Sequence, residues 1–287
     1  MKGMDYIKSK QICWAKRKGL KLFGCEVDKG FPIYVEKIEE NLFEPLTVES
    51  KQQFETADGG ELNDGPTEKA KMKALHSSTA FAVNVFQYWD SINKVHQIAH
   101  ACRFCNKENK TARKIKFEQK FMIHPMFSPC PNVDIIIENN TESRYKVFAI
   151  ECKFSEPYSS YKHAGLDGRY IGLPVWDGIK NAYDLAKSIS PTDNEFKYLH
   201  SAQLIKHILG LKKKYGKSAF RLLYLWYDVH GEEGYLHRKE IERFSEIVKK
   251  DGVNFSAISY QKLISNLVNK YYDGNEYYIN YLTDRYL

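Results

Sequence analysis

The sequence predicts an α/β protein in which a central mixed β-sheet is flanked by helices, in the order α-β-β-β-α-β. Three segments between residues 114 and 154 have the composition and spacing of strands. A later run, residues 220–229, is apolar almost throughout, as in a strand that is buried on both faces. Helical patterns precede and follow the three strands, and this alternation is typical of a layered α/β domain.

The first four elements each have a local signature. Residues 74–89 carry apolar side chains near helical spacing, so we expect a helix there. Residues 114–123 alternate between apolar and charged side chains, which is the periodicity of a strand. Residues 132–138 and 145–154 are two further strands, and the polar stretch 139–143 between them is a natural turn.

The rest of the chain continues this pattern. The later elements are helices over residues 176–189 and 199–215, a strand over 220–229, a helix over 238–250, a strand over 255–260, and one or two tyrosine-rich helices. Residues 56–71 are rich in Gly, Asp and charge, so we expect a loop or linker. We therefore divide the chain into an N-terminal extension and linker, residues 1–70, and a domain with a C-terminal helical elaboration, residues 71–287.

The composition bounds the class of protein. The chain has 287 residues, and its 14% aromatic content is too high for a disordered protein. Lys and Arg exceed Asp and Glu by 43 to 36, and the net charge of +7 suits a polyanionic partner. The six cysteines are too sparse for a disulfide framework, and no apolar run approaches the ~20 residues that span a bilayer. Because no signal peptide is evident either, we expect a cytoplasmic protein with no membrane partner.

The second and third strands bring charged residues together. If their turn is centred between Glu142 and Ser143, Glu138 lies opposite Val147 and Asp134 lies opposite Glu151. Directly opposed side chains of an antiparallel pair have Cβ atoms ~4.5–5.5 Å apart, so these two carboxylates need a cation between them. Mg²⁺ prefers such oxygen ligands, and Mn²⁺ could substitute for it. Lys153 follows Glu151 by two residues and therefore shares its face of the sheet.

The two faces of the third strand differ in character. Val147 and Ala149 share the face of Glu151 and are small, which leaves room for a substrate there. Phe148 and Ile150 lie on the opposite face, which we expect to form the core. The alternative is that Asp134, Glu151 and Lys153 are surface charges on an exposed strand, although charges within apolar strands are costly to bury.

The residues around these charges resemble a known motif. Pro-Asn-Val-Asp-Ile-Ile-Ile at 131–137, followed by Phe-Ala-Ile-Glu-Cys-Lys-Phe at 148–154, resembles the PD-(D/E)XK motif of the restriction-endonuclease-like nuclease superfamily. The order of elements over roughly residues 74–229 is similar to the core of that superfamily. Further segments are similar to an uncharacterised bacterial group within it. One departure is that Asp134 follows Pro131 by three residues rather than one.

The resemblance implies a metal-dependent nuclease that hydrolyses phosphodiester bonds in DNA. In this hypothesis Asp134, Glu151 and the backbone carbonyl of Cys152 hold Mg²⁺, which polarises the scissile phosphate and activates a water. Lys153 orients that water or stabilises the charge that develops on the phosphate. A role of Lys153 as general base would require a lowered pKa.

Three further residues are candidates by position. Glu118, on the polar face of the preceding strand, matches an additional acidic residue of the superfamily and could bind the same metal or a second one; the alternative is a solvated strand face. Gln203 resembles a Gln that many members direct from the following helix toward the site. His207 shares the helix face of Gln203, but we expect a surface or satisfied core histidine there.

Two other groups allow a functional interpretation. Cys102 and Cys105 follow His96 and His100 and could bind zinc, but two buried or incidental thiols are the expected interpretation. Basic clusters at residues 107–116 and 212–217 are either solvated ends of elements or phosphate contacts.

Two alternatives to a DNA nuclease stay open at this point. One is a nucleic-acid-binding protein with a degenerate nuclease site, and the other is a nuclease acting on RNA. The chain could also form a homodimer.

Overall fold

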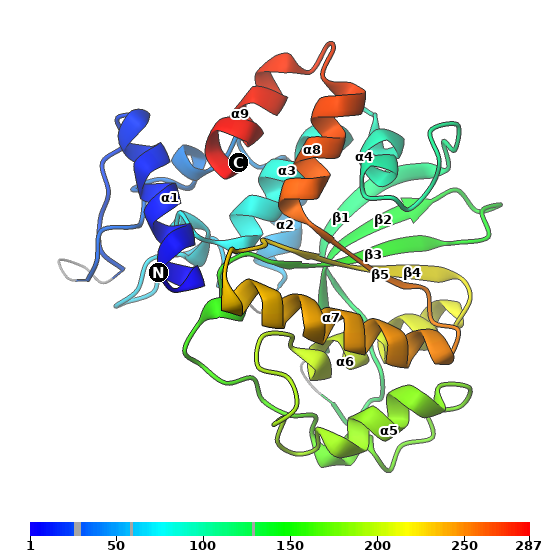
Figure 1. Cartoon of the computed structure of the whole chain (residues 1–287). Helices are drawn as coiled ribbons and strands as arrows, with labels where there is room; N and C mark the ends of the chain where they lie inside the picture. Colours follow the sequence, from blue (N-terminus) through cyan, green and yellow to red (C-terminus); the bar gives the residue numbers. More distant parts are fainter. Residues whose placement is uncertain (26–29, 58–59, 128–129) are drawn as a thin grey trace.

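A five-stranded mixed sheet forms the centre of the computed structural model, which describes residues 1–25, 30–57, 60–127 and 130–287 (Figure 1). The strands, which lie in sequence order across the sheet, are β1 Ala112–Lys120, β2 Asn132–Asn139, β3 Val147–Lys153, β4 Phe220–Trp226 and β5 Phe255–Ser259. Strand β2 runs antiparallel to β1 and β3, whereas β3, β4 and β5 run parallel to one another. The predicted α/β fold with a central mixed sheet is therefore confirmed.

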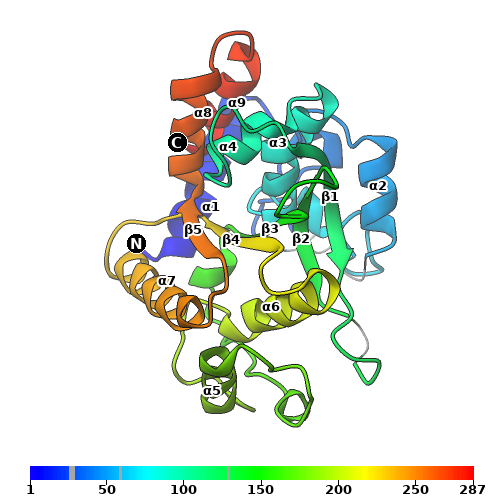
Figure 2. The ribbon, with the colours of Figure 1, turned by 90° about the vertical axis from the view of Figure 1, so that its right-hand side faces the viewer.

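Helices cover both faces of this sheet. They are α1 Gly3–Arg17, α2 Val48–Glu55, α3 Ser78–Ser91, α4 Val95–Ala101, α5 Lys180–Ser188, α6 Ser201–Tyr215, α7 Glu232–Lys250, α8 Tyr260–Tyr271 and α9 Glu276–Tyr286, with short 3-10 helices at Ile38–Asn41, Lys71–Lys73, Glu156–Tyr158 and Gly168–Tyr170. Helices α5, α6 and α7 lie on one side of the sheet, and α3, α4, α8 and α9 lie on the other (Figures 1 and 2). Each side has its own apolar core, because each face of the sheet must bury its apolar side chains against the helices that cover it.

The β2–β3 hairpin has the predicted register. Glu138 pairs with Val147, and the ladder continues to Ile135 opposite Ile150. The next register position would join Asp134 and Glu151, so the ladder ends where the two candidate carboxylates begin. This end of the hairpin is the place where β2 and β3 separate.

The small residues of β3 are not exposed to a substrate. Val147 and Ala149 are buried in the same core as Ile205 and Ile208 of α6. The prediction that this face leaves room for a substrate is therefore wrong along most of the strand. The reason is that β3 is an interior strand between two neighbours, and both of its faces are covered by helices.

The first helix of the predicted α-β-β-β-α-β core starts later than expected, at Ser78 rather than at residue 74. The hydroxyl of Ser77 accepts a hydrogen bond from the backbone N–H of Ala80 at 3.1 Å and so caps the helix. Ser, Thr, Asp and Asn are the residues that most often cap the start of a helix in this way.

The N-terminal residues pack closely on the rest of the molecule. Ile7, Leu42 and Phe54 belong to the same apolar core as α3. The predicted linker 56–71 includes residues 58–59, which lie outside the described residues. The division at residue 70 stays a prediction.

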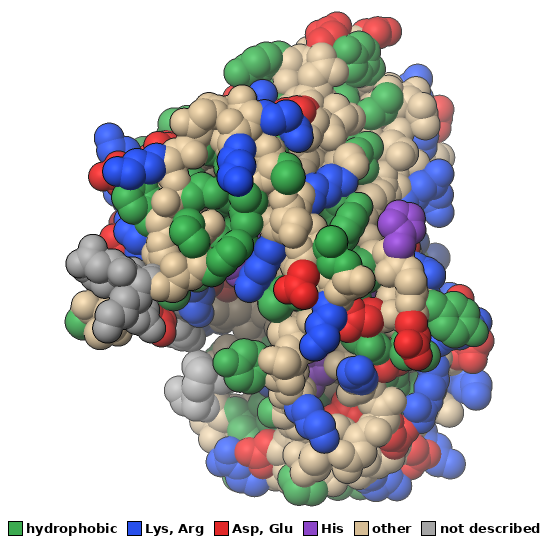
Figure 3. Space-filling view, turned by 60° about the vertical axis from the view of Figure 1, so that its left-hand side comes forward, with side chains coloured by type: hydrophobic (Ala, Val, Ile, Leu, Met, Phe, Trp, Pro, Cys, Tyr) green, Lys and Arg blue, Asp and Glu red, His purple; other side chains and the backbone are tan. Residues whose placement is uncertain are grey.

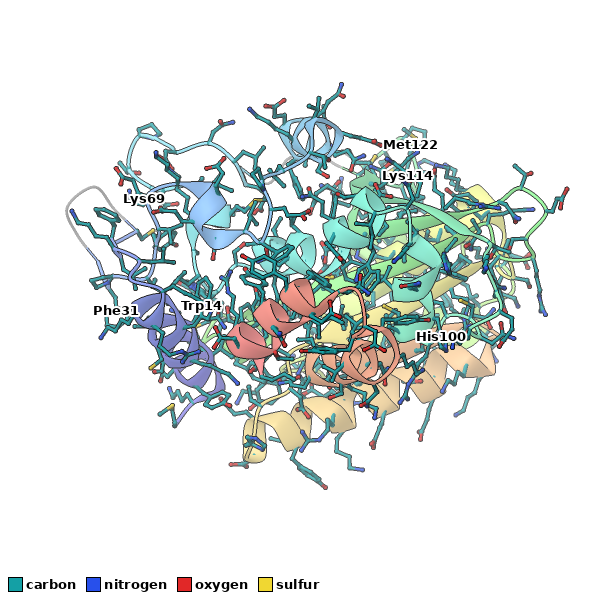
Figure 4. All side chains as sticks on the ribbon, turned by 90° about the horizontal axis from the view of Figure 1, so that it is seen from above. Trp14, Phe31, Lys69, His100, Lys114 and Met122 are labelled. Carbon is teal, nitrogen blue, oxygen red and sulfur yellow. The ribbon has the colours of Figure 1, made fainter. Side chains whose placement is uncertain are left out.

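A buried arginine joins the two ends of the chain. Arg285 on α9 is fully buried and stacks 4.1 Å above the ring of Trp14 on α1, which lies beside α9 in Figure 4. Its guanidinium donates to Gln11 Oε1 at 2.9 Å, to the Asn41 carbonyl at 2.8 Å and also to the Asn41 side chain. Helices α1 and α9 and the segment around Asn41 are thus held by one side chain.

A buried histidine under β4 makes the fold sensitive to acid. The ring nitrogens of His237 lie 3.1 Å from the hydroxyl of Tyr158 and 3.0 Å from that of Tyr224. Burial, together with the charges of His163 and Arg238, lowers the pKa of His237 to about 3. The ring is therefore neutral in the folded protein across the neutral and mildly acidic range.

We expect the contribution of His237 to the free energy of unfolding to fall as the pH is lowered from about 7 to 5. The unfolded chain binds a proton at His237 with a pKa of about 6.5, but the folded chain does not, so acid favours the unfolded state by about 2 kcal/mol over this interval. Urea unfolding at both pH values measures the loss. His237→Gln should lower stability overall but reduce this pH dependence, whereas the exposed His230→Asn should leave it unchanged. An equal pH dependence in wild type and His237→Gln would contradict the prediction.

Candidate active site

Asp134 lies at the point where β2 and β3 separate. Its Oδ2 atom accepts a hydrogen bond of 2.6 Å from the backbone N–H of Cys152, in the place where a strand carbonyl would otherwise accept it. The N–H and C=O of one strand residue point toward the same neighbour, so the carbonyl of Cys152 is also directed to the β2 side. The side chain of Asp134 and the main chain of Cys152 thus meet at one place.

Glu151 is held between two cationic or polar partners. Its Oε1 lies 2.5 Å from the ammonium of Lys153, and its Oε2 lies 2.7 Å from Nε2 of His207 on α6. The side chains of Glu151 and His207 are each only 1% exposed, whereas that of Lys153 is 16% exposed. The lysine is therefore the member of this group that reaches toward solvent.

The charges of this group act strongly on one another. Burial alone would lower the pKa of Lys153, but the carboxylates of Glu151 and Asp134 outweigh it and raise the pKa above its ordinary value. Burial would likewise raise the pKa of Glu151, yet Lys153 and His207 bring it well below its usual range. Glu151 and Lys153 consequently form a charged pair at neutral pH, and Lys153 is not a neutral amine.

Asp134 has the opposite tendency. Burial and the neighbouring charge of Glu151 raise its pKa well above the ordinary value, although Lys153 and the hydrogen bond from Cys152 act against them. A cation beside this carboxyl group would lower its pKa and return it to the charged form.

Glu118 lies beside Asp134 across the sheet. Its backbone φ of +50° is in the left-handed region, and it interrupts the ladder between Phe117 opposite Ile135 and Gln119 opposite Val133. Non-glycine residues adopt such angles at a cost of about 1–3 kcal/mol, often at functional sites. The side chain accepts a hydrogen bond from Asn132 at 3.2 Å, and burial together with the charge of Glu61 raises its pKa to about 7. Glu118 is therefore not the freely solvated residue of the alternative interpretation.

The donor set suits a hard divalent cation. Three carboxylates, those of Glu118, Asp134 and Glu151, face a single lysine charge, and an excess of buried negative charge is costly without a further cation. A cavity of about 10 Å³ between Glu118, Asp134, Cys152 and the first turn of α3 has room for roughly one water-sized species. Within the described part of the chain, however, no three His, Cys, Asp or Glu side chains form a ready-made metal cluster. Main-chain oxygen, water and phosphate would have to complete the ligand set.

Helix α6 reaches this group through a different residue than expected. Gln203 lies 3.1 Å from Nδ1 of His200, so its side-chain hydrogen bond is directed to that histidine rather than to Glu151. His207 follows one turn later on α6. It is buried and contacts Glu151, so it is not a surface residue, and its hydrogen bonding is incomplete. Its Nδ1 is buried without a hydrogen-bond partner among the described residues.

Two further carboxylates near the site were not among the candidates from the sequence. Glu61 comes from the predicted linker, and its charge is the strongest neighbouring influence on Glu118. Glu156, just after β3, accepts a hydrogen bond from the backbone N–H of Phe154 at 2.8 Å and helps to raise the pKa of Lys153. The position of Glu156 near Lys153 could have been inferred from its spacing, but that of Glu61 could not.

Two members of the cysteine and histidine group, Cys102 and His100, take part in packing. Cys102 is buried in the apolar core, and burial raises the pKa of its thiol well above the ordinary value. Nδ1 of His100 lies 2.6 Å from the hydroxyl of Tyr271 on α8. These contacts account for both residues as parts of the packing between α4 and α8.

The basic clusters are partly used within the fold. Lys114 pairs with Glu49 at 2.7 Å and with Asp90 at 3.1 Å, next to α2 and α3 (Figure 4). Lys212 and Lys213 donate to the backbone carbonyls of neighbouring loops at 3.1 and 2.9 Å. A role of these clusters in phosphate binding stays a prediction.

Comparison with protein families supports the interpretation from the fold. Residues 9–287 match the family described as Restriction Endonuclease associating with ARP. The chain belongs to this family. Comparison with curated proteins and with solved structures gives no significant match.

Membership of this restriction endonuclease family agrees with the sheet and its flanking helices, and it indicates a nuclease-like role with a nucleic-acid substrate. None of the helices in the described ranges is long and apolar enough to cross a membrane.

In this family member, His207 is expected to position Glu151. A buried donor on Oε2 fixes the carboxylate so that Oε1 remains directed toward Lys153, and loss of such supporting contacts typically costs 10–100-fold in metal affinity or activity. Under the hypothesis of a Mg²⁺-dependent nuclease, His207→Leu should therefore raise the Mg²⁺ concentration needed for half-maximal cleavage by roughly that factor. His207→Gln, which can still donate to Glu151, should restore most of it. A Leu variant with an unchanged Mg²⁺ midpoint, at equal folded fraction, would show that His207 has only a packing role.

Proposed function

We propose that this protein is a Mg²⁺-dependent nuclease that hydrolyses phosphodiester bonds in DNA, with an active site of the PD-(D/E)XK kind. The observation that carries the proposal is the meeting of Asp134, Glu151 and Lys153 where β2 and β3 separate. These groups are buried enough to alter one another's pKa, which is unusual for surface charges and common at catalytic centres.

The ligands of the metal would be Asp134, Glu151, the carbonyl of Cys152 and, for the same or a second ion, Glu118. When bound, Mg²⁺ supplies Lewis-acid chemistry, which polarises the scissile phosphate and makes a nearby water more acidic. Asp134 contributes its second oxygen, since Oδ2 already accepts from the main chain at 2.6 Å. Mn²⁺ could replace Mg²⁺ because the ligands are oxygens.

Lys153 acts on the phosphate through its charge. Its raised pKa keeps the amine protonated at neutral pH, which disfavours a general-base role. The protonated amine can donate to a phosphate oxygen and stabilise the negative charge that develops there in the transition state. Gln203 of α6, which contacts His200 at 3.1 Å, would assist through that histidine rather than directly.

Incubation of the purified protein with supercoiled plasmid tests the proposal. We expect nicked or linear DNA with Mg²⁺ or Mn²⁺ and intact plasmid with EDTA. Parallel reactions with a single-stranded oligonucleotide and with RNA identify the preferred nucleic acid. Binding of plasmid without cleavage under any metal would instead favour a binding protein with a degenerate site. Cleavage of RNA alone would favour a ribonuclease, and light scattering of the same sample would establish whether it is a homodimer.

A further inference from the structure

A lysine of α6 lies among the groups of the candidate active site. His207 contacts Glu151 at 2.7 Å from this helix, and Gln203 lies one turn before His207. Lys206 follows Gln203 by three residues and is partly buried. Side chains three or four residues apart on a helix are neighbours, so Lys206 lies next to Gln203 on the helix surface. The positive charge of Lys206 therefore belongs to the surroundings of Glu151.

The other lysines of α6 are held by partners within the fold. Lys212 and Lys213 donate to backbone carbonyls at 3.1 and 2.9 Å. The ammonium of Lys214 lies 5.2 Å from the ring centroid of Tyr215. Lys206 differs from them, because it makes no hydrogen bond, ion pair or ring contact within the described part of the chain. Its ammonium group is therefore available to a ligand.

The two carboxylates that act on Lys206 are already engaged elsewhere. Burial lowers the pKa of Lys206, and the charges of Glu151 and Asp167 act against this effect. Both oxygens of Glu151 are in contact, at 2.5 and 2.7 Å, with the lysine of β3 and the histidine of α6. Asp167 pairs with Arg169 at 2.6 Å. A partly buried charge without a direct partner is costly, and an anionic ligand would offset that cost.

The surroundings of Lys206 are open to the outside of the molecule. The charge of Lys206 acts on His200 at the start of α6, where it helps to lower the pKa of that ring. His200 and Lys153 together line an open space of about 150 Å³. The side of the molecule shown in Figure 3 is deeply hollowed, and Lys or Arg side chains lie near the hollow. A polyanion can therefore approach the candidate site at the level of Lys153 and α6.

We propose that Lys206 contacts the phosphate next to the scissile phosphate on the bound nucleic-acid strand. This inference rests on the proposed nuclease function. Lys153 contacts Glu151 directly, whereas Lys206 comes from a separate element and makes no ion pair with Glu151. Lys206 is thus beside the reacting centre rather than part of it. Contacts to phosphates fix the position of a nucleic acid without reading its sequence, so Lys206 contributes to affinity and not to sequence preference.

Binding of a short DNA duplex, measured in EDTA over a series of KCl concentrations, tests the contact. Lys206→Met, which keeps most of the aliphatic stem, should reduce the slope of log affinity against log salt by about 0.9 and weaken binding on the order of 10-fold at about 50 mM KCl. Lys206→Arg keeps the charge and should show neither change. Lys187→Met is the control, because Lys187 on α5 is half exposed and pairs with Asp184 at 2.8 Å. With Mg²⁺, Lys206→Met should raise the KM for plasmid and leave kcat nearly unchanged, as expected for a contact that contributes to binding alone.

The outcomes separate the phosphate contact from the nuclease function. If the wild-type protein cuts plasmid but a folded Lys206→Met protein keeps its salt slope and its KM, the contact is wrong and the function stands. A lower kcat and a higher Mg²⁺ midpoint at an unchanged salt slope would also overturn the contact, because Lys206 would then act by supporting Glu151. Lys206→Gln replaces the Met variant if that protein does not fold. A wild-type protein that neither binds nor cuts nucleic acid would overturn the proposed function itself.

Discussion

Lys153→Ala will lower the rate of plasmid cleavage by a factor on the order of 10²–10³ or more, the scale for deleting one main electrostatic contributor. The ammonium of Lys153 is the one cation within 2.5 Å of Glu151 in the described structure, and it is the part of the group that reaches solvent. DNA affinity should change only a few-fold, because most of it arises from many phosphate contacts elsewhere. Cleavage rates with saturating plasmid and binding constants in EDTA measure the two effects separately.

The folded state of the Lys153→Ala protein needs its own measurement. Removing one partner of a buried ion pair leaves Glu151 charged or forces it to take up a proton, at a cost of about 3–5 kcal/mol. Lys153→Arg keeps the positive charge and should fold normally, but its different geometry should not restore full activity. Lys116→Ala, which removes a part-exposed lysine paired with Glu138 at 2.9 Å, is the control and should cleave at nearly the wild-type rate. Wild-type cleavage by a folded Lys153→Ala protein would rule out this active site.

Arg285→Ala will lower the free energy of unfolding by about 2–4 kcal/mol. The substitution leaves buried oxygens of Gln11 and Asn41 without their donor, and it empties the space beside Trp14. Because α1, the segment around Asn41 and α9 all contact this one side chain, the effect should reach the N-terminal residues and the C-terminal helix together. Urea unfolding followed by tyrosine and tryptophan fluorescence measures it.

The same helix pair provides a matched control for Arg285. Arg17 on α1 pairs with Asp284 on α9 at 2.9 Å, but both side chains are largely exposed. Exposed pairs contribute little, so Arg17→Ala should cost less than about 1 kcal/mol. Similar losses for both variants would contradict the assigned role of Arg285. A second unfolding transition in the Arg285→Ala protein would indicate that residues 1–70 can unfold separately from the rest.

Local sequence patterns determined the elements that form the framework of the site. Apolar strands with a polar turn at residues 139–143 were sufficient to predict the hairpin and the pairing of Glu138 with Val147. The pairing follows because the side-chain period of a strand is two and the turn fixes the register. The same pattern placed Asp134 opposite Glu151, one position beyond the last pair of the ladder, where the strands separate. The order of strands and helices, which identifies the α/β class, also follows from local periodicity.

Only the tertiary structure decided what surrounds those charges. His207 contacts Glu151 although the two residues are 56 positions apart, and Glu61 approaches Glu118 from a segment that reads as a linker. The burial of Val147 and Ala149 under α6 likewise depends on where that helix docks. The spacing of residues within one strand or helix is set by backbone geometry, which the sequence displays directly. Contacts between distant segments depend instead on how whole faces pack, so the partners that set the pKa values of this site become visible only in the folded chain.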